Sequence, residues 1–315
     1  MAGAGRRSVP PLTRLATVRR RIARCGSSRL SRGGLRETAV CALQRVAPSA
    51  GKVLKAQIEF GVLLGSGPLW LTMTLEILPT RTSGAAENMA TDFLLLQRYP
   101  RATPRFRHYG WRGPAFTFGY SQKITFVRES LAAVESPFEL CRRATGGGVV
   151  DHRDDWTFAL VIPRGHPLEE LRATQSYREV HEALAAALRA QGVAAVTKPC
   201  VNEPVSEGAP AGPAGVCFQR AEIYDVVHGD TGEKIAGAAQ KRNKHGLLFQ
   251  GSLWRPAANV GSAAVDWEEF EEDFVARLAV ILGGEAHATP WPDLHEDEMT
   301  GLVEQYASTE WTESR

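Results

Sequence analysis

Cysteine is scarce in this chain, and the few cysteines present form no pattern. The 315 residues include only Cys25, Cys41, Cys141, Cys200 and Cys217, and no two of them are spaced as CxxC. Such irregular spacing excludes a disulfide framework and lacks the paired thiols of a zinc site. We therefore expect a protein of a reducing compartment, the cytoplasm, with no bound metal.

A long apolar run is also absent. The most apolar stretch, Val53 to Leu71, is interrupted by Lys55, Gln57 and Glu59. A transmembrane helix needs about 20 predominantly apolar residues, so we expect no membrane association.

Lysine and acidic residues are nearly missing from the N-terminus. Residues 1–50 hold eleven Arg, no Lys and one acid, Glu37, so their net charge is +10, whereas the whole chain carries +2. This composition is typical of a mitochondrial transit peptide, which would place the protein in the mitochondrial matrix. It also fits a mis-assigned start upstream of Met73, which we favour, or a basic nucleic-acid-binding arm. We expect residues 1–72 to be a disordered extension and residues 73–315 to form one domain.

Apolar periodicity predicts alternating helices and strands in residues 73–315. In one predicted helix, Tyr177 and Leu184 fall on the apolar face, and Gly192 is the stop signal. The predicted helices are 86–99, 175–191 and 267–282, and the predicted strands are 106–109, 115–120, 137–141, 156–162, 223–228, 234–240 and 247–254. Several of these strands are joined by hairpins, and the alternation of helices and strands indicates an α/β (α+β) fold.

The run RRATGGGVVDH at Arg142 to His152 contains three consecutive glycines. Glycine adopts positive φ readily and lets a ligand approach the backbone, so this loop can cradle a carbonyl or a phosphate. Arg142 and Arg143 add donors that suit phosphate or carboxylate oxygens. The alternative is a surface turn with solvated arginines.

A second run, from Val216 to Ser252, pairs Cys217 with Lys234. A free thiol, with a pKa of about 8.5, is only about one tenth thiolate at cytosolic pH, and a nearby ammonium can raise that fraction. The predicted hairpin brings Lys234 close to Asp225 but leaves Cys217 well up the chain. The segment 216–222 must therefore fold back over the sheet for the two to meet. Otherwise Cys217 is an inert buried thiol and Lys234 a solvated hairpin residue.

Both runs, in this order and at this spacing, resemble the lipoate-protein ligase and octanoyltransferase family, which shares its catalytic fold with biotin-protein ligases. The resemblance extends to ENMATDFLL at Glu87 to Leu95, to RHYGWRGPAFTFGYSQ at Arg107 to Gln122 and to EWT at Glu310 to Thr312. It implies a central mixed, largely antiparallel sheet flanked by helices. The GRGRxG-type loop of biotin ligases is absent, which argues against biotin as the substrate.

The position of the cysteine distinguishes branches of this family. Cys217-Phe218 precedes Lys234, as in one octanoyltransferase pattern, and no cysteine follows Cys217. Tyr224-Asp225 stands where ATP-dependent ligases show Asn-Asp, which weakens the ligase reading. The resemblance thus implies transfer of octanoyl from acyl carrier protein, through a thioester, to the lysine of a lipoyl domain.

Glycine cleavage H protein and the E2 subunit of a 2-oxoacid dehydrogenase are the acceptors that the resemblance suggests. No cofactor and no nucleic acid would be needed. The alternatives are an ATP-dependent lipoate-protein ligase, which would use ATP and Mg²⁺, and a non-catalytic protein that binds acyl groups or their carrier.

The resemblance also assigns the site. Cys217 and Lys234 are the expected catalytic residues. Arg143 and the three glycines would orient the acyl carbonyl, and His152 would either support the ligand loop or be structural. Gly237 and Ala238 would allow close approach of the acyl chain, unless they serve only tight packing. The expected substrate-binding residues are Arg142, Arg143, Thr145, Gly146, Gly147, Gly148, His152, Asp225, Gly237 and Ala238.

Overall fold

The computed structural model describes residues 73–98, 102–199, 220–261 and 264–314 of the chain. The predicted extension, residues 1–72, lies outside this part, so its nature stays a prediction. Cys217 and Cys200 also lie outside the described residues.

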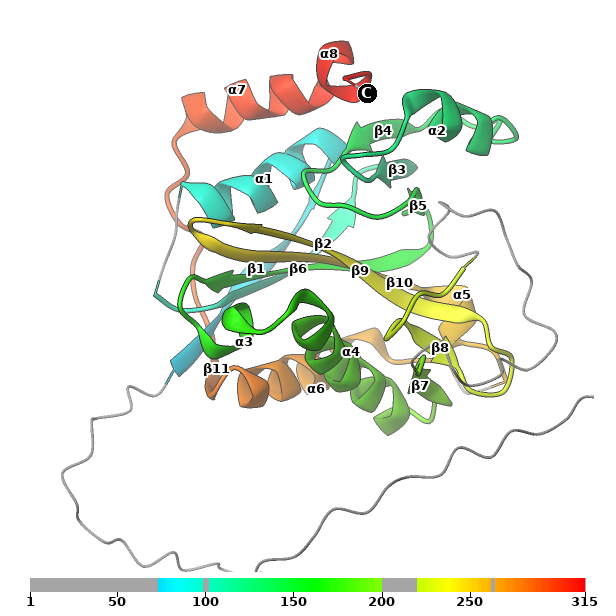
Figure 1. The fold of residues 1–315 in the computed structure, drawn as a ribbon, viewed down its shortest axis with the longest axis vertical. Helices are drawn as coiled ribbons and strands as arrows, with labels where there is room; N and C mark the ends of the chain where they lie inside the picture. The colour runs from blue at the N-terminus through cyan, green and yellow to red at the C-terminus, as the bar shows by residue number, and fades with distance from the viewer. Residues whose placement is uncertain (1–72, 99–101, 200–219, 262–263, 315) are drawn as a thin grey trace, which may run out of the picture. The chain divides into compact units, whose positions relative to one another are not determined.

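Eight strands form one mixed sheet in the order β11-β1-β2-β6-β10-β9-β8-β7 (Figure 1). Strand β1 runs parallel to both of its neighbours, β11 and β2, and the other five pairings in this sheet are antiparallel. The predicted mixed, largely antiparallel sheet is therefore confirmed. Its strands are β1 (Met73–Ser83), β2 (Arg105–Trp111), β6 (Asp155–Pro163), β7 (Ala195–Thr197), β8 (Val226–His228), β9 (Lys234–Asn243), β10 (Gly246–Trp254) and β11 (Gly284–Ala288).

A second sheet of three short strands carries the glycine loop. Its order is β4-β3-β5, with β3 (Ala115–Phe118) parallel to β4 (Glu139–Arg142) and antiparallel to β5 (Val150–Asp151). The loop joins β4 to β5. Although β2 and β3 are separated only by a Gly-Pro turn, they belong to different sheets, because the chain leaves the large sheet at this turn.

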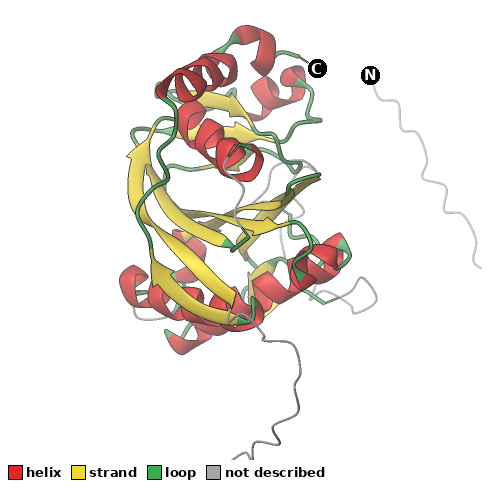
Figure 2. Ribbon diagram, turned by 90° about the vertical axis from the view of Figure 1, so that its left-hand side faces the viewer, coloured by secondary structure: helices red, strands yellow, loops and turns green. Residues whose placement is uncertain are grey.

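Helices cover both faces of the large sheet (Figure 2). α4 and α6 lie on one face, and α1 and α7 on the other (Figure 1). The helices are α1 (Ala85–Gln97), α2 (Ile124–Ser130), α3 (Pro167–Glu170), α4 (Ala173–Ala190), α5 (Arg255–Ala258), α6 (Trp267–Ile281), α7 (Glu296–Ala307) and α8 (Thr309–Thr312). None of the helices in the described part of the chain is long and apolar enough to cross a bilayer.

Strand β6 shows why the sheet is covered on both faces. Successive side chains of a strand point to opposite faces. Phe158 and Leu160 accordingly join the core beneath α4 and α6, whereas Ala159 and Val161 join the core beneath α1. The sequence of a strand that is buried on both faces is a continuous apolar run, and such a run predicted this strand.

The three predicted helices correspond to α1, α4 and α6, with ends that differ by no more than two residues. Gly192 follows α4 with a φ of +82°, the left-handed conformation expected of a helix stop. The predicted hairpin of β8 and β9 is also present. These elements formed as predicted because local periodicity and turn residues specify them.

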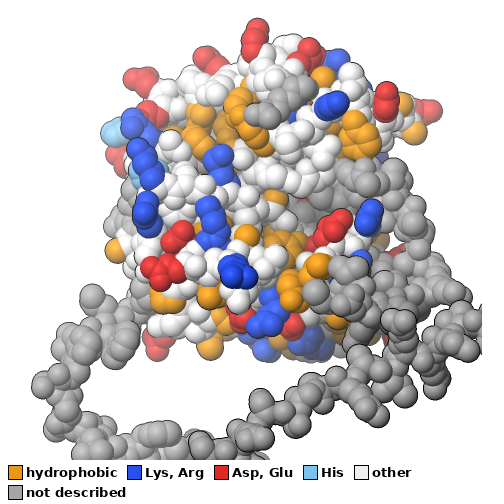
Figure 3. All heavy atoms as spheres, in the orientation of Figure 1, with side chains coloured by type: hydrophobic (Ala, Val, Ile, Leu, Met, Phe, Trp, Pro, Cys, Tyr) orange, Lys and Arg blue, Asp and Glu red, His pale blue; other side chains and the backbone are white. Residues whose placement is uncertain are grey.

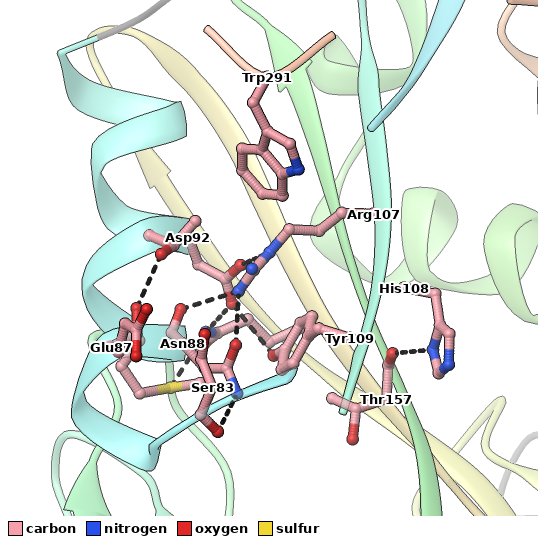
Figure 4. A network of polar contacts seen from close by, with 12 residues as sticks. Ser83, Glu87, Asn88, Asp92, Arg107, His108, Tyr109, Thr157 and Trp291 are labelled. Carbon is pink, nitrogen blue, oxygen red and sulfur yellow. Dashed lines mark hydrogen bonds and ion pairs between the residues drawn. The ribbon is translucent and has the colours of Figure 1, made fainter. Parts of the chain in front are cut away.

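A buried carboxylate, Asp92 on α1, ties this helix to the sheet (Figure 4). Its Oδ1 accepts from Arg107 Nε at 2.7 Å, and its Oδ2 accepts from Tyr109 at 3.2 Å and from Gln250 Nε2 at 2.7 Å. Arg107 comes from β2 and is itself only 2% exposed. Figure 4 shows its guanidinium directed at Asp92, with the ring of Trp291 on the other side. Both charges are needed together, because either one alone would be buried without a partner of opposite charge.

We predict that Arg107→Met destabilises the fold by about 3–5 kcal/mol, since it leaves Asp92 charged and buried without its cation. Urea unfolding of the purified variant measures this. The exposed pair of Arg112 and Glu87 provides the control, and Arg112→Met should cost less than about 1 kcal/mol. Equal effects of the two substitutions would contradict the role given to Asp92.

His181 on α4 is a second buried polar group. Its Nδ1 donates to the carbonyl oxygen of Tyr224 at 2.7 Å, and its Nε2 has no partner among the described residues. Burial lowers the pKa of His181 to about 4 from an ordinary 6.5. Between about pH 4 and pH 6.5, the imidazole is therefore neutral in the folded protein but protonated in the unfolded chain.

The sign of the pH dependence follows from that lowered pKa. The stability due to neutral His181 is complete above pH 6.5 and is lost as the pH falls toward about 4, to a limit of about 3 kcal/mol. We predict that His181→Gln makes the loss of stability between these pH values shallower, as measured by urea unfolding at several pH values. His287→Gln, at an exposed histidine, should leave the wild-type curve unchanged. Parallel curves for wild type and His181→Gln would refute the prediction.

Candidate active site

The glycine loop is held in shape by Arg143. Gly147 has a φ of +89°, which requires glycine. Arg143 Nη2 donates to the carbonyl oxygens of Gly146 at 2.8 Å and Gly148 at 3.0 Å, and its Nη1 donates to Thr117 Oγ1 at 2.8 Å. The guanidinium thus fixes the loop from inside, and it also lines a cavity beneath the loop.

Arg142 and Thr145, which the resemblance assigns to substrate binding, line neither of the two cavities of the site. Adjacent strand residues point to opposite faces, so Arg142 turns away from the loop side that Arg143 faces. Its buried guanidinium donates to the carbonyl oxygens of Tyr120, Gln122, Trp311 and Thr312. Thr145 is buried and donates to Gln250 Oε1 at 2.7 Å. Neither Arg142 nor Thr145 is among the described residues that line the cavities. Arg142 instead holds α8 in place, and Thr145 holds the glycine loop.

His152 lies at the other end of the loop, stacked on Trp111 with ring centroids 4.0 Å apart. Its Nδ1 is 2.7 Å from Asp155 Oδ2, and its Nε2 is 2.7 Å from Thr117 Oγ1. A carboxylate only accepts, so the network assigns the N–H to Nδ1 and makes Nε2 the acceptor of the Thr117 hydroxyl. A hydrogen-bonded chain thereby runs from Arg143 through Thr117 and His152 to Asp155.

Two further hydroxyls, of Thr157 and Ser252, donate to Asp155 Oδ2 at 2.7 Å and 2.5 Å. Together with Thr117 and His152, these residues line the same inner cavity. Their polar atoms are therefore bonded to one another, and a ligand that enters need not supply hydrogen bonds.

Lys234 is placed by an irregularity in the hairpin. Val227 pairs with Lys234 but Val226 pairs with Ala236, so β9 carries one extra residue and forms a β-bulge. Bulges redirect the side chains beside them. Lys234 is only 8% exposed, and its Nζ lies 2.7 Å from Asp225 Oδ2. The predicted proximity of Lys234 and Asp225 is confirmed, although both are buried rather than solvated.

Gly237 makes room for the lysine. A Cβ at this position would lie 2.7 Å from both Cε and Nζ of Lys234, and 3.1 Å from Asp225 Oδ1. The lysine side chain therefore lies directly against the Gly237 backbone. Ala238, the next residue, lines both cavities of the site and donates its backbone N–H to the Tyr177 hydroxyl at 2.9 Å.

Two adjacent cavities, which share lining residues, define the site. An inner cavity of about 50 Å³ lies beneath the glycine loop, and an outer groove of about 480 Å³ lies beside it. Gly147, Lys234, Ala238 and Ala239 line both, so the lysine ammonium stands at their junction. Nine of the predicted site residues line one or both cavities, namely Arg143, Gly146, Gly147, Gly148, His152, Asp225, Lys234, Gly237 and Ala238.

The cysteine described by the structure is not part of this site. Cys141 is buried, and burial raises the pKa of its thiol to about 12. The thiol contacts the carbonyl oxygen of Tyr306 at 3.6 Å. It is an inert core residue, as the sequence indicated. Cys217, the predicted nucleophile, lies outside the described residues.

Tyr177 and Met89 contribute to the site although neither was predicted to. Tyr177 lines the outer groove from α4, and Met89 lines the inner cavity from α1. Both fall in phase with apolar helix positions, so periodicity places them in a core. No signal in the sequence separates a cavity wall from a packed interior.

The sequence is similar to proteins of known type over the region that forms this site. Octanoyltransferase LipM of Bacillus cereus is 32% identical over 170 residues, which cover 53% of this chain and 60% of the relative. Octanoyltransferase LipM of an Exiguobacterium species is 32% identical over 184 residues, 57% of this chain and 65% of the relative. The chain therefore spans less than two thirds of the length of these relatives.

Solved structures share the fold. A lipoate-protein ligase A bound with ATP superimposes with a TM-score of 0.57 at 18% identity, over 76% of this chain and 99% of the other. A bipartite lipoate protein ligase from Thermoplasma acidophilum gives the same TM-score and identity, over 76% of this chain and 96% of the other.

The family model named lipoyl protein ligase A/B catalytic domain matches residues 84–256, which run from the start of α1 to the start of α5 and include the glycine loop and the Lys234 hairpin. This match covers more than half of the chain. The chain therefore belongs to the lipoyl protein ligase A/B catalytic domain family.

Proposed function

We propose that this protein is an octanoyltransferase of protein lipoylation that works through a thioester on Cys217. The observation that carries the proposal is the buried Lys234 ammonium, held by Asp225 where an inner cavity meets an outer groove. A cation fixed at such a junction can stabilise a thiolate beside an acyl chain.

The course of the chain supports Cys217 as the nucleophile. Arg220, Glu222 and Ile223 line the outer groove together with Lys234, which supports the expected approach of the preceding residues to this lysine. Cys217 precedes Arg220 by three residues, which span at most about 11 Å. This short span supports Cys217 as the nucleophile.

The chemistry takes place in two transfers. The Cys217 thiolate attacks the thioester carbonyl of octanoyl carrier protein, which releases the carrier thiol and leaves octanoyl on the cysteine. The ε-amine of a lipoyl-domain lysine then attacks this second thioester, forms the amide and restores the thiol. Lys234 stabilises the Cys217 thiolate and gives a proton to the released carrier sulfur. It is then a neutral amine, held by Asp225, that can take up the proton of the incoming amine. Arg143 and the glycine loop border the position of the acyl carbonyl.

The inner cavity suits an acyl tail by its chemistry, because its polar side chains are bonded to one another. Its present volume of about 50 Å³ holds only a few water molecules, so side chains must move to admit an octanoyl chain. Met89 is suited to this, since methionine is unbranched and flexible.

The partners of the reaction are part of the proposal. They are octanoyl acyl carrier protein as donor and a lipoyl domain, such as that of glycine cleavage H protein or of a 2-oxoacid dehydrogenase E2, as acceptor. We place the reaction in the cytoplasm, and in the mitochondrial matrix if residues 1–72 are a transit peptide.

ATP-dependent ligation of lipoate is the alternative within the family. Asp225 and Glu222 are the carboxylates among the described residues that line the two cavities. Both oxygens of Asp225 are already engaged, by Tyr177 on one side and by Lys234 and the Glu222 N–H on the other. A magnesium ion there would have to displace Lys234, which favours transfer without nucleotide.

We predict that incubation of the full chain with octanoyl carrier protein, without ATP, yields a hydroxylamine-labile octanoyl adduct by intact-mass analysis. Cys217→Ser should lose the adduct because the attacking sulfur is gone. Cys200→Ser, a change of the same kind nearby in the sequence, should keep it.

Other results of this experiment identify the alternatives. Acylation of a lipoyl domain that requires ATP and lipoate, with no adduct, would make the protein a ligase. Neither adduct nor turnover under any of these conditions would leave a protein that only binds acyl groups or their carrier.

We also predict that Gly237→Ala lowers the rate of octanoyl transfer by about 10²-fold, because the new methyl displaces the Lys234 ammonium. Transfer to a lipoyl domain, followed by mass spectrometry, gives the rate. Gly113→Ala is the matched control, since a Cβ there meets no atom within 4 Å. A wild-type rate in Gly237→Ala would show that the position of Lys234 does not matter for transfer.

A further inference from the structure

Tyr177 occupies a place in the site that the proposed chemistry leaves unexplained. It lies in the first half of α4, is partly exposed and lines the outer groove. Its hydroxyl donates to Asp225 Oδ1 at 2.5 Å and accepts from the Ala238 N–H at 2.9 Å. One phenol thus joins a helix, the loop before β8 and strand β9.

These contacts determine the orientation of the Asp225 carboxylate. While Tyr177 holds Oδ1, Oδ2 accepts from the Glu222 N–H at 2.6 Å and faces Lys234 Nζ at 2.7 Å. Rotation of the carboxylate would break the Tyr177 contact first and would carry Oδ2 away from the ammonium. The Lys234 ammonium is therefore held by the Asp225 carboxylate, whose own orientation is fixed by Tyr177 and the Glu222 N–H.

The ring of Tyr177 is fixed as well. It makes an edge contact with His181, one helical turn later, at 4.0 Å between centroids. His181 Nδ1 in turn bonds the carbonyl of Tyr224. Tyr224 has a φ of +65°, the only positive value for a non-glycine among the described residues, and it immediately precedes Asp225. A positive φ is costly for a bulky residue, so the surrounding contacts must maintain it.

We propose that Tyr177 is a positioning residue of this site, which fixes the Asp225 carboxylate and through it holds the Lys234 ammonium at the junction of the two cavities. Its importance for turnover rests on the proposed function. Its effect on Lys234 does not, because that effect is a property of the unliganded protein.

The first test therefore measures Lys234 directly. The full-length protein is treated briefly with acetic anhydride, and acetylation of Lys234 is compared by peptide mass spectrometry with that of Lys244. Lys244 is exposed in the turn between β9 and β10 and serves as internal standard. Figure 3 shows Lys and Arg side chains gathered along one side of the face that it draws. Tyr177→Phe should raise the relative acetylation of Lys234 at least about threefold, since the ammonium is less restrained.

Two variants calibrate this result. Asp225→Asn removes the direct partner of Lys234 and should raise its acetylation at least as much. Tyr306→Phe makes the same chemical change in a buried tyrosine of α7, remote in the fold, and should leave it at the wild-type level. Wild-type acetylation in Tyr177→Phe, together with an increase in Asp225→Asn, would overturn the proposal. An equal increase in Tyr306→Phe would do the same.

The second measurement is octanoyl transfer to a lipoyl domain. Tyr177→Phe should lower kcat about tenfold and change KM for the lipoyl domain less than twofold, because positioning affects the reacting state rather than acceptor binding. A loss confined to KM would overturn the positioning role. If the wild type transfers no octanoyl, the proposed function fails, yet the acetylation result still decides what Tyr177 does to Lys234.

Discussion

A buried negative charge on α1 is the constraint on which the arrangement of this protein depends. The Asp92 carboxylate has no access to water, so its stability requires that Arg107, Tyr109 and Gln250 be in place. These partners come from β2 and β10, and Gln250 passes the connection on to Thr145 at the start of the glycine loop. The position of the glycine loop over the inner cavity therefore depends on the contacts between α1 and the sheet.

The candidate site contains a second buried carboxylate that is held by several partners. Asp225 is buried, and its oxygens are shared between Tyr177 and Lys234. Charges removed from water interact more strongly and are not free to reorient. An ammonium held in this way is ready to stabilise a developing negative charge without rearrangement, which is what preorganisation of an active site requires.

Several polar side chains that line the inner cavity are hydrogen-bonded within the protein. Thr117, His152, Thr157 and Ser252 are bonded to one another or to Asp155, so their hydrocarbon parts are what a ligand meets. A polar composition and an apolar ligand are compatible here because the hydrogen-bond requirement is met before the ligand arrives.

The sequence by itself determined the elements and the family motifs. Period-3.6 patterns predicted α4 and α6, turn residues predicted the hairpin of β8 and β9, and the hairpin register put Lys234 near Asp225, because all of these depend on neighbours close in sequence. Only the tertiary structure decided which side chains face the site. Arg142 and Arg143 are alike and adjacent, yet one holds the C-terminal helix and the other lines the cavity. Tyr177 satisfies the apolar period of its helix but reaches a carboxylate 48 residues away. Such contacts depend on how distant segments pack, and no local pattern encodes that.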